Sequence, residues 1–487
     1  MHITSLPGPF GIGTMGREAY RFVDFLEAAG QSLWQILPLG PTSYGDSPYQ
    51  SFSAFAGNPY LIDFDLLRED GLLLPEEYEG IRWSDTPEYV DYGRLYEQRY
   101  PVLRRAYDRF LQQKPGDYDE FCRSNEEWLP DYALFMALKD AHEGHQWCDW
   151  EEAQKRRDPA AIAEARRCYA AEIGFVMMQQ YLFAKQWFAL KRYANERGIR
   201  IIGDIPIYVP RDSADVWSEP HQFELDKHYD PVEVAGCPPD GFSPDGQLWG
   251  NPLYNWETMR ADGYRWWVNR IRRSRDLYDI IRIDHFRGFD SYYAIPYGAA
   301  TAREGRWREG PGIGIFHAFR AALGELPIIA EDLGFLTPGV RQLLAESGFP
   351  GMKVLQFAFD SREDSDYLPH NYGRHCVVYT GTHDNDTILG WFQTASPEDI
   401  AYAVEYLRLT PEEGYHWGMM KAALQSPGDT VVLTMQDLLG LGSEARMNIP
   451  ATLGCNWKWR ALPGAITLEL AEKLRRMTGI YRRLPQN

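Results

Sequence analysis

The chain has 487 residues, of which 44% are hydrophobic, and its formal net charge at pH 7 is −19. This length suits one large domain with insertions, or two to three ordinary domains. So acidic a surface repels phosphate groups, which argues against nucleic acids and anionic membranes as partners.

The six cysteines show no pattern of a metal site or a disulfide framework. They are scattered without a CxxC pair, at Cys122, Cys148, Cys168, Cys237, Cys376 and Cys455. Reduced thiols are typical of a cytoplasmic protein, so we expect that location and no bound metal. Residues 1–16 contain four Gly and two Pro and predict no secretory signal, and no run of 18 apolar residues predicts a transmembrane helix.

Aromatic residues make up 14% of the chain, with 16 Trp and 30 Tyr. Many of them stand beside Gly, Pro, Asp or Asn, in contexts that are typical of loops. Exposed rings beside hydrogen-bonding groups suit sugars, whose C–H faces stack on aromatic rings. Much of this aromatic content can equally belong to the core.

The first elements alternate between helix and strand. Residues 17–30 place apolar side chains on one helical face and end at Gly30, which predicts a helix. Residues 33–37 predict a buried strand that ends at Pro38. A long helix over 172–197 and a strand over 200–205 repeat the order, which is the signature of an α/β fold.

Three stretches interrupt this alternation within what we expect to be one domain over residues 1–487. Residues 40–60 predict a long loop, and its aromatic content favours a functional loop over a disordered one. Residues 66–170 are rich in Glu, Arg and Tyr at helical spacing and predict a mainly helical insertion. Residues 210–260 predict a second, irregular insertion that carries a lid loop.

Later strands are predicted at regular intervals, over residues 280–283, 328–330, 352–357, 376–379 and 431–435. Together with the two earlier strands they make seven, separated by helices. A barrel of eight parallel strands needs one more. That strand should precede the first helix, where the sequence after Met1 offers only residues 2–5.

Three acidic residues stand where such a strand turns polar: Asp284, Glu331 and Asp384. In a barrel of parallel strands, the C-terminal ends of the strands converge on one face, so these carboxylates should converge too. Cleavage of a glycosidic bond needs one carboxylic acid at the leaving oxygen and one carboxylate facing the anomeric carbon. The three acids therefore predict chemistry on a bond between sugars.

The neighbours of these acids indicate different roles. Arg282 lies two residues before Asp284 on the same strand face and should lower its pKa, as suits a nucleophile. Glu331 follows the apolar residues 328–330, so partial desolvation should raise its pKa and keep it protonated as an acid. Asp384, beside His383, can bind sugar hydroxyls. Alternatively, each acid can cap the next helix or lie on the surface, and the histidines can be structural.

Six stretches, read together, resemble the 4-α-glucanotransferases (amylomaltases or disproportionating enzymes) of glycoside hydrolase family 77. They are residues 43–53, 203–206, 247–252, 282–288, 330–334 and 381–387. The resemblance implies a (β/α)8 TIM barrel with helical and loop insertions and no separate C-terminal β-sandwich. It also implies a retaining enzyme that moves α-1,4-glucan segments to an acceptor glucan or glucose through a covalent glucosyl-Asp intermediate. No metal or organic cofactor is implied.

The resemblance implies roles for individual residues. Asp284 is the expected nucleophile, Glu331 the acid/base and Asp384 the transition-state stabiliser. Tyr44 and Trp249 are expected to hold sugar rings, with Trp249 on a lid near residues 240–252. The other implied substrate contacts are Ser47, Tyr49, Asp204, Gln247, Arg282, His285, His383, Asn385 and, flanking the acceptor side, Asn456.

The sequence departs from the family at its start. Family members usually begin with an apolar strand before the match to residues 2–7, whereas here Met1 directly precedes His2. We therefore expect either an upstream start or a curtailed first strand. Two other functions remain open from the residues alone, a non-catalytic α-glucan-binding protein and a retaining α-glucan hydrolase.

Overall fold

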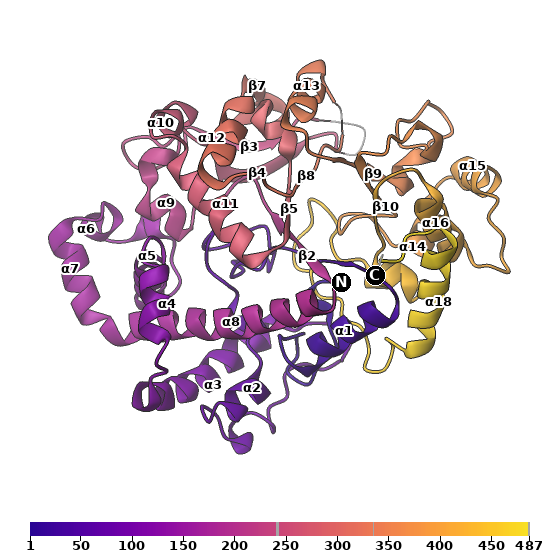
Figure 1. The fold of residues 1–487 in the computed structure, drawn as a ribbon. Coiled ribbons are helices and arrows are strands. Elements are labelled where there is room, and N and C mark those ends of the chain that lie inside the picture. Colours follow the sequence, from indigo (N-terminus) through magenta and orange to yellow (C-terminus); the bar gives the residue numbers. More distant parts are fainter. Residues whose placement is uncertain (240–242, 335, 486–487) are drawn as a thin grey trace.

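The computed structural model describes residues 1–239, 243–334 and 336–485 (Figure 1). Seven parallel strands form two sheets, with the orders β1-β2-β5-β8 and β9-β10-β11. They are β1 (Leu33–Gln35), β2 (Arg200–Ile205), β5 (Ile280–Ile283), β8 (Ile328–Ala330), β9 (Gly351–Val354), β10 (Cys376–Tyr379) and β11 (Thr430–Val432). The Ala330 N–H donates to the Pro350 carbonyl at 3.0 Å and links the two sheets.

The parallel strands thus follow one another in chain order, as they do in a (β/α)8 barrel, and the predicted α/β class is confirmed. All seven predicted strands are present, and three end earlier than predicted, β1 at Gln35, β9 at Val354 and β11 at Val432. Residues 355–358 leave the sheet as a 3-10 turn, and Met435 begins helix α17. Ile283 of β5 pairs with Ala330 of β8, so the next residue of each strand emerges at the same level.

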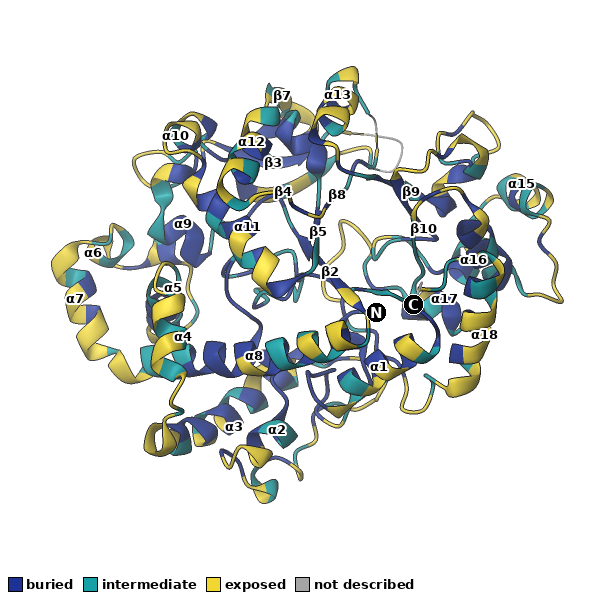
Figure 2. Ribbon diagram, viewed as in Figure 1, coloured by how far each residue is buried: buried dark blue, intermediate teal, exposed yellow. Residues whose placement is uncertain are grey.

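Helices pack around the strands and turn their exposed faces outward, while the strands in the centre are buried (Figure 2). None of the helices in the described ranges is long and apolar enough to cross a membrane. The helices are α1 (Arg17–Ala28), α2 (Phe64–Glu69), α3 (Tyr92–Gln113), α4 (Tyr118–Ser124), α5 (Leu129–Ala141), α6 (Glu152–Lys155), α7 (Pro159–Cys168), α8 (Ala170–Glu196), α9 (Ala214–Ser218), α10 (Trp256–Ala261), α11 (Arg265–Leu277), α12 (Ile313–Leu323), α13 (Pro338–Ser347), α14 (Ile388–Thr394), α15 (Pro397–Leu407), α16 (Tyr415–Gln425), α17 (Met435–Leu438) and α18 (Leu468–Ile480).

The two helices predicted by residue range lie where the apolar pattern placed them. Helix α1 buries the predicted face, including Phe22 and Val23, and ends two residues before Gly30. Gly30 has a φ of +65°, which lets the chain turn back after the helix. Helix α8 spans nearly the whole of the predicted 172–197 segment.

An antiparallel sheet lies beside the parallel strands, and the sequence analysis did not predict it. It has the order β4-β3-β6-β7, with β3 (Glu233–Cys237), β4 (Gln247–Pro252), β6 (Ser291–Pro296) and β7 (Arg306–Glu309). The interpretation of residues 210–260 as irregular was therefore wrong for β3 and β4. Strand β4 contains Gly, Asn and Pro, which strands disfavour, and its sheet is completed by strands far along the chain.

Residues 1–2 lie beside β1. The Leu37 N–H donates to His2 Nδ1 at 3.1 Å, and the Trp34 indole N–H donates to the Met1 carbonyl at 2.7 Å. Burial lowers the pKa of the Met1 amino group to about 6. The residues that follow, Ile3–Ser5, form a 3-10 turn and not an eighth strand, so a closed barrel remains a prediction.

Gly203 on β2 leads to a test of this packing. A Cβ at position 203 would lie 2.1 Å from Cγ of Tyr278, a buried ring held between strands and helices. Gly203→Ala should therefore lower the free energy of unfolding by about 1–3 kcal/mol, as overpacked cores do. Urea unfolding followed by tryptophan fluorescence measures this loss.

Gly373→Ala is the matched control, because a Cβ there would meet no atom within 4 Å. Its effect should stay within about 0.5 kcal/mol, as is usual for surface positions. Equal stabilities of the two variants would contradict the described packing of Tyr278 on β2.

Candidate active site

Asp284 and Glu331 emerge side by side from the C-terminal ends of β5 and β8. The Asp284 N–H donates to the Ile205 carbonyl and the Glu331 N–H to the Ile283 carbonyl, both at 3.0 Å. These bonds continue the hydrogen-bond ladders of the parallel sheet beyond its last paired residues and hold both acids at one level. The sequence analysis placed the two acids correctly at strand ends.

Asp284 and Asp384 do not cap helices, although the sequence left this alternative open. The 3-10 turn after Asp284 has His285 at its N-cap without a side-chain cap bond. Asp384 follows β10, and the next helix, α14, is capped by Thr387, whose side chain accepts from the Gly390 N–H. The capping alternative is therefore wrong for Asp284 and Asp384.

A cavity of about 290 Å³, open to solvent, lies at this end of the strands. Asp284 and Asp384 both line it, and Glu331 lies directly behind His285. One oxygen of Glu331, Oε2, accepts from the His285 N–H at 2.7 Å, and Oε1 accepts from the Leu333 N–H at 2.8 Å. Two backbone donors thus fix the Glu331 carboxyl beside Asp284.

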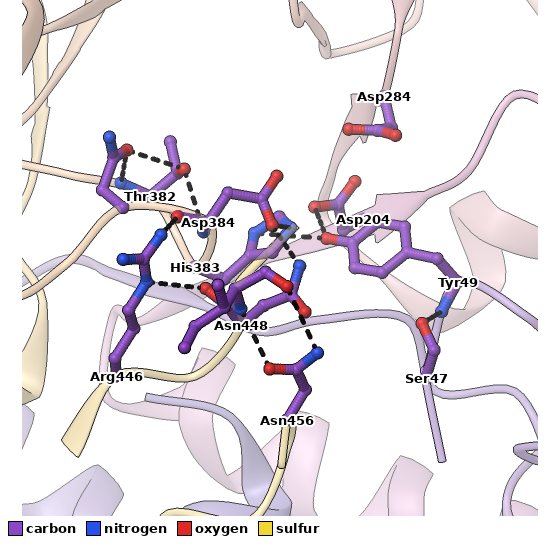
Figure 3. A network of polar contacts seen from close by, with 12 residues as sticks. Ser47, Tyr49, Asp204, Asp284, Thr382, His383, Asp384, Arg446, Asn448 and Asn456 are labelled. Carbon is purple, nitrogen blue, oxygen red and sulfur yellow. Dashed lines mark hydrogen bonds and ion pairs between the residues drawn. The ribbon is translucent and has the colours of Figure 1, made fainter. Parts of the chain in front are cut away.

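One guanidinium nitrogen joins two carboxylates beneath the cavity. Nη1 of Arg282 lies 2.6 Å from Oδ2 of Asp204 and 3.0 Å from Oδ1 of Asp284. The side chain of Arg282 is 3% exposed and that of Asp204 is completely buried. The Tyr49 hydroxyl donates to Asp204 Oδ2 at 2.9 Å (Figure 3), so Tyr49 and Arg282 bind the same oxygen of Asp204.

The pKa values of Asp284 and Glu331 differ because their surroundings differ. Burial raises the pKa of Asp284 to about 6, although Arg282 opposes this shift. The expectation that Arg282 lowers this pKa overall was wrong, because desolvation outweighs the ion pair. Burial and the neighbouring Asp284 raise the pKa of Glu331 further, to about 8. Of this coupled pair, Asp284 therefore ionises first and Glu331 keeps its proton.

Two histidines and two aromatic rings form part of the wall. The His383 ring stacks on Tyr49, with centroids 4.9 Å apart, and the Trp249 ring meets His285 edge to face at 4.9 Å. Burial lowers the pKa of His285 to about 3, so this imidazole is neutral at pH 7. Its Nε2 is buried without a hydrogen-bond partner among the described residues, and can therefore bind a hydroxyl of a ligand.

The structure brings most of the predicted site residues to this cavity. Those that line it are Ser47, Tyr49, Gln247, Trp249, Asp284, His285, His383 and Asp384. Arg282 and Asp204 lie beneath it. Residues 247–252 form strand β4, not a loop, and residues 240–242 of the predicted lid lie outside the described residues.

Besides Arg282 and Asp204, three further predicted contacts do not line the cavity. Tyr44 is 79% exposed at the surface. The Asn385 side chain accepts from the Thr382 N–H at 2.8 Å and so fixes a turn. Asn456 is buried and accepts from the Ile449 N–H at 3.0 Å. Asn385 and Asn456 thus shape loops next to the cavity.

The sequence analysis also missed residues of the cavity wall. Asn448, Pro450, Ala451 and Trp457 come from one loop near the C-terminus. Their only signal was Gly and Pro flanking polar residues, which marks any loop. Nothing in their spacing connects them with Asp384, which lies more than 60 positions earlier. In the described part of the chain, no group of three His, Cys, Asp or Glu side chains is placed to hold a metal ion.

Comparison with known proteins agrees with this geometry. A sequence profile of the family described as 4-alpha-glucanotransferase matches residues 1–465. The chain is 50% identical over 485 residues to the 4-alpha-glucanotransferase of Clostridium butyricum, covering 99% of this chain and 100% of that protein. The chain belongs to the 4-alpha-glucanotransferase family.

Other members of the 4-alpha-glucanotransferase family show the same extent of similarity. The 4-alpha-glucanotransferase of Thermus thermophilus is 48% identical over 496 residues, covering 99% of this chain and 98% of that protein. The solved amylomaltase of Streptococcus agalactiae in complex with acarbose superposes with a TM-score of 0.97 at 45% identity, covering 100% of this chain and 99% of that one. The family resemblance found from six short stretches is thus confirmed.

The buried ion pair leads to a second test. Arg282→Met leaves the carboxylate of Asp204 buried without its cation, so the free energy of unfolding should fall by about 3–5 kcal/mol. Adding Asp204→Asn should restore part of this loss, because an amide carries no charge. Urea unfolding of both variants at pH 7 measures the difference. A double variant no more stable than Arg282→Met would show that the unpaired charge is not the cause.

Proposed function

We propose that this chain is a retaining 4-α-glucanotransferase. It would move an α-1,4-glucan segment to the 4-hydroxyl of an acceptor glucan or glucose through an ester on Asp284. The observation that carries the proposal is the adjacent pair of carboxyls, Asp284 and Glu331, with its ordered pKa values. Membership of the family and the acarbose bound to the S. agalactiae amylomaltase support a glucan ligand.

The first half of the reaction uses the two acids in opposite states. Protonated Glu331 gives its proton to the glycosidic oxygen while the bond from that oxygen to C1 breaks. The Asp284 carboxylate attacks C1 from the other side and forms the ester. The leaving glucan departs with a new 4-hydroxyl, and Glu331 is left as a carboxylate.

The second half reverses these roles. The Glu331 carboxylate takes the proton of the acceptor 4-hydroxyl, whose oxygen attacks C1 and displaces Asp284. Glu331 is then protonated again and Asp284 ionised. Two displacements at C1 retain its α configuration.

The polar residues around Asp284 support this division of work. Arg282 stabilises the ionised nucleophile, and Asp204, completely buried, acts through Arg282 and not by touching sugar. His285 and His383 line the cavity and offer ring nitrogens to sugar hydroxyls. Asp384 stabilises the transition state. Tyr44, at the exposed surface, would hold a more distant part of a long glucan.

We further propose that residues 1–487 form one catalytic domain in the cytoplasm, with no cofactor. The stretches 66–170 and 210–260 would be insertions between barrel strands. The first contains α3 to α7, and the second contributes β3 and β4 to the antiparallel sheet. Strand β4 carries Gln247 and Trp249 to the cavity, so this insertion completes the substrate cleft.

A hydrolase would use the same carboxylates, so the fate of the ester separates the two functions. Water is present at about 55 M and an acceptor at roughly 1 mM, so transfer needs a preference of roughly 10⁵, or about 6–7 kcal/mol. Acceptor binding and exclusion of water must supply it. The rings of Tyr49, Tyr208, Trp249 and Trp457 line the cavity and are suited to both tasks.

Incubation with maltotriose, followed by chromatography of the products, tests the proposal. A ladder of shorter and longer glucans is expected. Glucose and maltose alone would indicate a hydrolase, and unchanged maltotriose would indicate a binding protein. The Asp284→Asn variant is the control, because its amide cannot form the ester.

Trp249 provides a test of water exclusion. Trp249→Ala opens the cavity beside His285, so water should reach the ester more easily and the ratio of hydrolysis to transfer should rise severalfold. The yields of glucose and of longer glucans from maltotriose give this ratio. The exposed Trp307, 44% exposed on β7 and not part of the cavity wall, gives the control Trp307→Ala. An unchanged ratio in Trp249→Ala would show that this ring does not exclude water from the ester.

The pH dependence tests the roles of the two acids. The value of kcat/KM should rise as Asp284 ionises near pH 6 and fall as Glu331 loses its proton near pH 8. Glu331→Gln should lose the alkaline limb with α-maltosyl fluoride as donor, because fluoride leaves without a proton. Fluoride release measured across the pH range gives both profiles. An alkaline limb that survives in Glu331→Gln would assign it to another group.

A further inference from the structure

Asp384 differs from the other two acids in how it is held. Its side chain is 48% exposed, on the turn after β10, so packing does not fix its rotamer. Two groups contact its Oδ1 instead. The Asn448 Nδ2 donates to it at 2.6 Å, and the His383 Nε2 lies 3.3 Å away (Figure 3).

Both polar backbone groups of Asn448 are hydrogen-bonded. Its N–H donates to the His383 carbonyl at 3.1 Å, and its carbonyl accepts from Nε of Arg446 at 2.8 Å. The same Arg446 donates through Nη2 to the Asp384 carbonyl at 2.6 Å. Three hydrogen bonds thus join residues 383–384 to residues 446–448, and the bond from Arg446 to the Asn448 carbonyl holds the second segment together.

The loop after Asn448 is closed by a buried side chain. Asn456 accepts from the Ile449 N–H at 3.0 Å and donates to the Thr452 carbonyl at 3.0 Å. The Trp457 N–H donates to the Met447 carbonyl at 2.7 Å. The amide of Asn448 is therefore presented to Asp384 by an ordered loop, although the loop tip is exposed.

A neutral donor such as Asn448 suits an acid that must keep its negative charge, as Asp384 must. Arg282 binds Asp284 with a full positive charge, whereas Asn448 binds Asp384 with a neutral amide, which orients Oδ1 and leaves the negative charge. Within the described residues, no hydrogen bond reaches Oδ2 of Asp384. This oxygen is therefore available to a sugar hydroxyl, with its direction set by Asn448.

We propose that Asn448 is a positioning residue that orients Asp384 for the transition state, with Arg446 and Asn456 holding its loop in place. The proposal rests on the proposed transferase function and adds a residue outside the six stretches that carry the family resemblance. Orientation of Asp384 matters more in the transition state than in substrate binding. Loss of the amide should therefore act on kcat more than on KM.

A double-mutant cycle tests whether Asn448 acts through Asp384. Asn448→Ala should lower kcat about ten- to hundredfold with α-maltosyl fluoride as donor, with KM changed less than about threefold, as expected for a lost hydrogen bond to a charged group. In an Asp384→Ala background, measured with α-maltosyl fluoride, the same substitution should lower kcat less than about twofold. A decrease equal in both backgrounds would overturn the proposal.

Two further variants separate positioning from loop stability. Asn448→Asp is nearly isosteric but places a carboxylate against Asp384. Relative to wild type at the same pH, kcat should therefore fall further at pH 8 than at pH 5. Thr452→Ala loosens the same loop without touching Asp384, and should keep kcat within about threefold of wild type. A decrease in Thr452→Ala as large as in Asn448→Ala would show that loop order alone explains the effect. Wild-type inactivity on maltotriose would instead refute the transferase function.

Discussion

A single buried guanidinium holds the reactive end of this fold together. Nη1 of Arg282 contacts both Asp204 on β2 and Asp284 beyond β5, so two neighbouring strands share one cation. Because Arg282 is 3% exposed and Asp204 is completely buried, water does not screen their ion pair, whereas the side chain of Asp284 is 30% exposed at the cavity. The nucleophile is thereby fixed in a partly desolvated position, which keeps its carboxyl oxygen poorly hydrated and available to attack carbon.

The roles of the other two acids follow from how far each is exposed to solvent. Glu331 is fixed by two backbone N–H groups and keeps its proton, because the charge of Asp284 and burial oppose its ionisation. Asp384 is half exposed and is held by a neutral amide from a distant loop. One fold thus supplies an ionised carboxylate, a protonated carboxyl and an oriented surface carboxylate at the same end of its strands, by burial, by backbone donors and by a side-chain amide.

Much of this arrangement could be predicted from sequence, and the failures have physical causes. The seven parallel strands and the strand-end acids were found because buried strands are apolar runs that end at a polar residue. The antiparallel sheet was missed because β4 carries Gly250, Asn251 and Pro252, and because β3 pairs on its other edge with β6, far along the chain. The net shift of the Asp284 pKa was predicted with the wrong sign, because sequence shows the neighbouring Arg282 but not the degree of burial. Asn448 was missed because no local pattern links it to Asp384.

The central claim is that Asp284 carries the sugar as a covalent ester. Glu331→Gln, incubated with α-maltosyl fluoride and quenched in acid, should accumulate this ester, because the second half of the reaction needs Glu331 as a base. Mass spectrometry of proteolytic peptides should then find a maltosyl adduct on Asp284. Fluoride release without an adduct, or an adduct on another residue, would contradict the account.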